Sequence, residues 1–151
     1  MATTAGFPRS ALTKAALLLL AFLPLVGCLS SVTARKAPKA DLSQLKHIFV
    51  EHRLNDNHRM DELIVQELQA LGYDAASGPL TMASPETDAV ITYEDQWTYD
   101  FTSHLIGFSL VVTDNLHHRQ LAEGSYYRPS VTHMAPAEMI HLTVLKVFRD
   151  R

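Results

Sequence analysis

The residues of this 151-residue chain with the clearest capacity for chemistry are its eight histidines and its single cysteine. Two short segments, His133-Met134 and Met139-x-His141, place imidazoles beside thioethers, a ligand combination that copper sites use. The spacings typical of zinc sites, such as HExxH, do not occur. Two interpretations stay open: surface histidines without a ligand, which is the default, or a metal site built from His133, Met134, Met139 and His141.

Asp95 is the second candidate, because it falls on the apolar face of a strand predicted over residues 89–101. This segment, AVITYEDQWTYDF, alternates with a period of two, which places Asp95 between Tyr93 and Trp97. A buried carboxylate requires a hydrogen-bonding or charged partner. Arg128 or the backbone donors of a helix start would satisfy it, and a β-bulge would turn it outward. We therefore expect a structural role for Asp95.

The aromatic residues on the same face have two interpretations. They could line a ligand groove, or they could form the core beneath the helices, which we expect because aromatic side chains bury the most surface. If the strand extends past the helices, Tyr99 and Phe101 become an exposed patch at which a partner would bind. The candidate ligand or partner surface is therefore Asp95, Trp97, Tyr99 and Phe101.

No catalytic residue is predicted. The chain has neither a GxSxG nucleophile motif nor a glycine-rich phosphate loop. The adjacent acids Glu94 and Asp95 point to opposite faces of one predicted strand, so they cannot act as a pair across a sugar ring. We expect a protein that is not an enzyme and uses no cofactor.

Cys28 follows a segment with the features of a secretory signal peptide. Arg9 and Lys14 form a basic start, and Ala15–Val26 is an apolar run of twelve residues without charge. At about 1.5 Å per residue this run spans roughly 18 Å, which is too short for a hydrocarbon core of about 30 Å. The basic region, the short apolar region and the small residue Gly27 predict a signal peptide over residues 1–27.

Leu25-Val26-Gly27-Cys28 resembles the lipobox of bacterial lipoproteins at every position. The resemblance implies cleavage between Gly27 and Cys28, a diacylglycerol on the Cys28 thiol, and acylation of the new amino group. Two or three acyl chains hold a protein to a membrane far more firmly than one. No Asp follows Cys28, so the resemblance implies the periplasmic face of the cell outer membrane. The alternative is an ordinary signal peptide followed by an unrelated free cysteine.

The charge of the mature chain is unevenly distributed. Residues 28–40 are small, polar and basic, and we expect a lipidated cysteine followed by a flexible tether. Residues 41–151, the predicted single periplasmic domain, contain 8 basic and 16 acidic residues, a formal net charge of −8. This sign argues against a nucleic-acid partner.

The periodicity of residues 41–151 predicts an α+β fold. We expect strands over 46–52, 89–101, 104–113 and 119–127, helices over 60–71 and from 136 to about 148, and an optional edge strand near 73–76. The order β-α-β-β-β-α predicts a two-layer sandwich, with two helices on one face of a mostly antiparallel sheet.

Finer expectations concern particular positions in these elements. Asn55 or Asn57 is expected to cap the first helix and Gly72 to end it. In the second long strand the apolar face is predicted to contain Ile106, Phe108, Leu110 and Val112. In the last helix the buried stripe is predicted to contain Met139 or Ile140, Thr143, Val144, Val147 and Phe148.

The segments ELQALGYDAASG and ETDAVITYEDQW resemble those of small envelope lipoproteins, in which a helix ending in LG and an aromatic residue leads to a DAV strand. The amino-terminal domain of TolB and the auxiliary lipoproteins of ABC transporters are similar in outline over roughly residues 46–148. The resemblance implies a non-catalytic binding or assembly helper of the cell envelope, with an envelope protein as partner. The alternative function is a periplasmic protein that binds a metal or small ligand.

Overall fold

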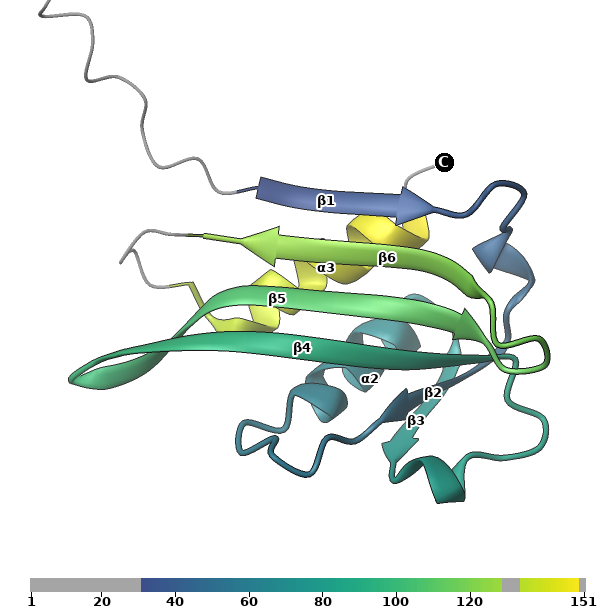
Figure 1. Ribbon diagram of the computed structural model, residues 1–151, viewed down its shortest axis with the longest axis horizontal. Helices are drawn as coiled ribbons and strands as arrows, with labels where there is room; N and C mark the ends of the chain where they lie inside the picture. Colours follow the sequence, from purple (N-terminus) through teal and green to yellow (C-terminus); the bar gives the residue numbers. More distant parts are fainter. Residues whose placement is uncertain (1–30, 129–133, 150–151) are drawn as a thin grey trace, which may run out of the picture.

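The computed structural model of the protein describes residues 31–128 and 134–149. These residues form one six-stranded mixed sheet in the order β1-β6-β5-β4-β2-β3 (Figure 1). The strands are β1 (Ser31–Lys36), β2 (His47–Glu51), β3 (Asp74–Gly78), β4 (Ala89–Asp100), β5 (Thr102–Asp114) and β6 (Gln120–Tyr127). Strand β2 runs parallel to both β3 and β4, and the other pairs are antiparallel.

Two helices, α2 (Met60–Ala70) and α3 (Pro136–Arg149), cover one face of this sheet (Figure 1). Short 3₁₀ turns at Leu42–Gln44 and Leu80–Met82 complete the described secondary structure. The predicted two-layer α+β architecture is therefore confirmed. Within the described residues, no helix has the length and apolarity needed to cross a bilayer.

The core lies between the helices and the sheet. The predicted stripe of α3 is confirmed for Met139, Ile140, Thr143, Val144 and Val147, which are all buried, whereas Phe148 is half-buried at the edge of the core. Helix α3 lies very close to β6 at Gly124, where an added Cβ would overlap Val147 Cγ2. A side chain at this position would push the helix away from the sheet.

The prediction of a flexible tether over residues 28–40 is wrong for Ser31–Lys36, and with it the start of the folded domain at residue 41. This segment is edge strand β1, antiparallel to β6. Its side chains alternate: Val32 and Ala34 pack against the core, while Thr33 Oγ1 lies 2.8 Å from Ser125 Oγ. The alternation is too short and too polar to distinguish from a linker by composition, so pairing with β6 decides its structure.

The predicted apolar face of β5 is wrong at one position. The β4–β5 register changes between Gln96, opposite Gly107, and Trp97, opposite Leu105, so Ile106 is the extra residue of a β-bulge. A bulge reverses the alternation of side chains on the strand. Leu105 is consequently the buried residue, and Ile106 is only half-buried.

Candidate functional site

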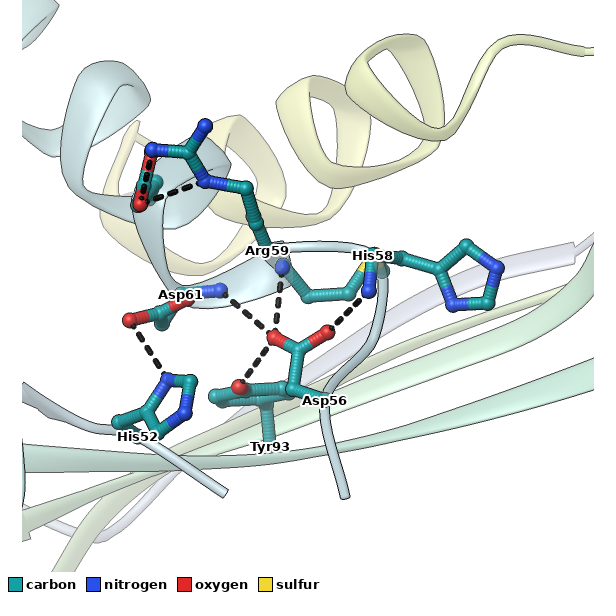
Figure 2. Close-up of polar contacts among 8 residues, drawn as sticks. His52, Asp56, His58, Arg59, Asp61 and Tyr93 are labelled. Carbon is teal, nitrogen blue, oxygen red and sulfur yellow. Dashed lines mark hydrogen bonds and ion pairs between the residues drawn. The ribbon is translucent and has the colours of Figure 1, made fainter. Parts of the chain in front are cut away.

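Asp56, in the loop between β2 and α2, accepts several hydrogen bonds that join separate elements. Its carboxylate accepts hydrogen bonds from the Tyr93 hydroxyl at 2.7 Å and from the backbone N–H groups of His58 at 2.9 Å and Met60 at 2.6 Å (Figure 2). The Asp61 N–H is a longer fourth donor at 3.4 Å. Asp56 therefore accepts donors from the first turn of α2 and joins that turn to β4.

These contacts explain how Asp56 caps α2. The residue that precedes the first turn of this helix is Arg59. Arg59 has a left-handed φ of 55° and makes no side-chain cap. The chain thus turns sharply before Met60, and the Asp56 carboxylate, four residues before Met60, reaches the free N–H groups of the helix. The capping residue is Asp56 rather than Asn55 or Asn57, so that prediction was wrong by one position.

Burial and hydrogen bonding act in opposite directions on the Asp56 pKa. Burial alone would raise it, but the donors from Tyr93 and the α2 backbone outweigh burial and hold the pKa below its ordinary value. Burial, together with the hydrogen bond to the anionic Asp56, raises the pKa of Tyr93 far above its ordinary value. At neutral pH the pair is therefore a carboxylate acceptor and a neutral phenol donor.

His52, Asp56 and Asp61 come close enough to suggest a metal site. One ligand atom from each lies within 4.8 Å of the others, and His52 Nδ1 is 3.1 Å from Asp61 Oδ2. Asp61 Oδ1 is buried and has no hydrogen-bond donor among the described residues.

The electrostatics of this cluster favour helix capping over cation binding. Both oxygens of Asp56 already accept N–H or O–H donors, which compete with a cation for the same lone pairs. The amino end of α2 also carries a partial positive charge, which attracts carboxylates and repels cations. The His52, Asp56, Asp61 and Tyr93 group, called the capping cluster below, is therefore a device that fixes the start of α2 against β4.

Asp95 lies beside the capping cluster on the helix-covered face, as predicted, and both of its carboxylate oxygens accept a side-chain donor. Its side chain is 13% exposed, with Arg53 Nη1 at 2.6 Å from Oδ1 and the Trp97 indole N–H donating to Oδ2. Neither of these two contacts involves Arg128, the side-chain partner predicted from the sequence. The Trp97 ring stacks on His58, with ring centroids 3.6 Å apart. Arg53 and His58 thus tie the loop before α2 to β4.

The row of aromatic residues along β4 changes from buried to exposed toward the hairpin turn. Tyr93 is in the core at 3% exposure, and Trp97 is half-buried. Tyr99 and Phe101 are 77% and 92% exposed. Tyr99 and Phe101 are therefore outside the core, because the β4–β5 hairpin extends past the helices (Figure 1), which is the condition under which the sequence predicts an exposed patch.

The predicted metal ligands of the carboxyl-terminal part do not come together as one site among the described residues. Met139 is fully buried in the core, and His141 Nδ1 lies 2.6 Å from Glu67 Oε2 on α2. Met134 is half-buried and packs against the core. His133, like Gly27 and Cys28, lies outside the described residues.

Sequence reasoning missed the capping cluster, although a signal was present. The segment NDNHRMD carries an acid four residues before the first helical residue, Met60, and another in the first turn. Aspartate is among the preferred residues at helix starts, so the segment indicates a cap. The partner across the loop, Tyr93, is 37 residues away and has no local signal.

Comparison with known proteins gives a fold and no family. No protein-family model matches the chain, and no curated protein matches it. Among solved structures it is similar to a PelC dodecamer from Paraburkholderia phytofirmans in two crystal forms. For one, a PelC variant, identity is 14%, the TM-score is 0.60, and the match covers 82% of this chain and 100% of that chain. For the other, identity is 13%, the TM-score is 0.58, and the coverages are 82% and 99%.

A more distant similarity is to a PDZ domain protein from Parabacteroides distasonis, with 15% identity and a TM-score of 0.47. It covers 78% of this chain and 34% of that one. The two PelC matches show that the chain shares its fold with PelC.

Proposed function

We propose that this protein is a lipid-anchored, non-catalytic protein of the bacterial envelope that works by binding and assembly at the periplasmic face of the outer membrane. The lipobox residues Leu25–Cys28 support the anchor. The capping cluster supports a role without catalysis, since the Asp56 carboxylate accepts donors from Tyr93 and the start of α2 and so holds α2 against β4.

The observation that carries the proposal is the position of β1. It begins at Ser31, three residues after Cys28. Three residues span at most about 10 Å. A domain held this close to its acyl chains acts at the membrane surface and does not reach across the periplasm.

The first partner to test is a second copy of the chain. The PelC structures of the same fold are dodecamers. Strands β1 and β3 form the two edges of the sheet, and within the described residues each pairs with a neighbour on one side only. An edge strand can accept a further strand from another molecule. Self-association at the membrane is therefore the proposed form of assembly.

The anchor is tested by feeding cells a clickable palmitate analogue and isolating the tagged protein. We expect the wild-type chain to carry the label and Cys28→Ala to lose it, because the only acceptor thiol has been removed. Ser30→Ala is the matched control, since it alters the same segment and keeps the thiol. An unlabelled wild-type protein would refute lipidation.

Self-association is tested separately by native mass spectrometry of the detergent-solubilised wild-type protein. We expect a defined complex of several copies. A monomer at all concentrations would remove a second copy as the partner, and crosslinking in cells would then identify another envelope protein.

A further inference from the structure

The register of the sheet shows that β1 begins at the same end as the β4–β5 hairpin turn. Ser31 is opposite Tyr127, Tyr127 is opposite Gly107, and Gly107 is opposite Gln96. The start of β1 therefore lies level with Gln96. Among the residues that the structure describes, the strand pairing beyond this level belongs to the hairpin, which runs to Asp100 and back from Thr102 and projects from the sheet in Figure 1.

Two lengths can be measured from this level: the length of the hairpin and the reach of the link between Ser31 and Cys28. The hairpin extends four residues past Gln96, about 13 Å at about 3.3 Å per residue. The three residues between Ser31 and Cys28 span at most about 10 Å. If Cys28 carries the acyl chains, as proposed above, they are attached no more than about 10 Å from Ser31, and the hairpin is long enough to reach the same lipid surface.

Large exposed apolar side chains gather at this end. Phe101 is at the hairpin turn, 92% exposed, with Tyr99 beside it at 77% and Tyr127 level with Ser31 at 48%. Leu54 is 98% exposed and follows Arg53, whose ion pair to Asp95 places that loop next to β4. Single exposed apolar residues are ordinary, but several together at one end indicate a contact surface.

The backbone of the hairpin turn and the charges of the opposite turn fit the same interpretation. Phe101 has a φ of 57°, a left-handed conformation that is uncommon for a bulky residue and that here presents the ring to the outside. The opposite end of the sheet differs: the turn between β5 and β6 reads DNLHHR, and its one exposed apolar side chain, Leu116, is flanked by polar and charged groups that include the ion pair of Arg119 with Asp114 at 3.8 Å. Aromatic rings favour the boundary between lipid headgroups and acyl chains, and ionic turns favour water.

We propose that the hydrophobic end of the domain, formed by Leu54, Tyr99, Phe101 and Tyr127, lies against the lipid surface that holds Cys28, with Phe101 entering the headgroup boundary. The inference rests on the proposed lipid anchor and adds an orientation to it. The strands then stand on the membrane, and the β5–β6 turn points away from it. The short link between Cys28 and Ser31 and the non-covalent contact of the hydrophobic end with lipid together fix this orientation.

The test uses the full-length lipidated protein in phosphatidylcholine vesicles with brominated acyl chains, which quench nearby tryptophan. Trp97 is the only tryptophan of the chain, so Trp97→Phe gives a dark background. Phe101→Trp in that background reports the hairpin turn. Leu116→Trp is the matched control, because Leu116 is 80% exposed in the β5–β6 turn.

We expect brominated lipid to quench Phe101→Trp at least about twofold more than Leu116→Trp, because an interfacial side chain sits about 5–10 Å into the headgroup region. Equal quenching of the two would overturn the orientation. A blue-shifted but unquenched Phe101→Trp that depends on protein density would also overturn it, and would show that protein covers this end.

Vesicle flotation separates this proposal from the anchor itself. Protein that floats with vesicles but shows no quenching difference keeps the anchor and loses the orientation. Protein that carries no lipid and does not float contradicts the anchor and, with it, the basis of the orientation. Far-UV circular dichroism of each variant confirms that the folded domain is being compared.

Discussion

Replacing Asp56 with alanine tests the capping cluster. Asp56→Ala removes the acceptor for the first turn of α2, which by itself costs about 0.5–2 kcal/mol of unfolding free energy. It also leaves the Tyr93 hydroxyl, on a side chain 3% exposed, without its acceptor, which adds about 1–3 kcal/mol. We therefore expect a destabilisation of roughly 2–5 kcal/mol, a large share of the stability of a domain of this size.

The measurement is urea-induced unfolding followed by far-UV circular dichroism, with a double-mutant cycle on Tyr93→Phe. If the two side chains act through their hydrogen bond, the double variant should be less destabilised than the sum of the single variants, by about 1–3 kcal/mol. Asp74→Ala is the control, because the Asp74 carboxylate is 77% exposed and its contact with His47 is worth less than about 1 kcal/mol. Additive single effects, or an Asp56→Ala change as small as the control, would refute the reasoning.

Asp56 should also lower the free energy of unfolding as the pH falls into the acid range. Because hydrogen bonds hold the folded-state pKa of Asp56 below the ordinary 3.8, its contribution is present above that value and is lost as the pH falls through the lowered pKa. The difference in unfolding free energy between wild type and Asp56→Asn should therefore shrink between about pH 5 and about pH 2. A difference that is constant over this range would contradict the assignment.

Three further changes test other contacts. Gly124→Ala should cost about 1–3 kcal/mol in urea unfolding, because its Cβ overlaps the stiff Val147 side chain, and Val147→Ala in the same chain should recover part of the loss. Glu67→Gln should lower stability by less than about 1 kcal/mol by the same measurement, because the His141 side chain is 47% exposed. Asp88→Ala should speed amide hydrogen exchange at the start of β2, where its carboxylate accepts two backbone N–H groups at 2.7 and 2.9 Å; unchanged exchange would argue against that role.

The sequence by itself determined the elements whose signal is local. Period-two alternation predicts β4, β5 and β6, and helical spacing with Gly72 at its end predicts α2. The two-layer arrangement follows, because each of these elements has one apolar face to bury. The acylation of Cys28 is likewise a prediction from sequence alone.

Tertiary structure decided everything that depends on a distant partner. Ser31–Lys36 reads as a linker until β6 pairs with it, and Asp95 has no visible partner until the loop before α2 brings Arg53 to it. The bulge at Ile106 places Leu105 in the core against the simple alternation. Alternation and capping signals act over a few residues, whereas strand pairing, ion pairs and the reach of the hairpin depend on contacts between residues tens of positions apart, which no local pattern records.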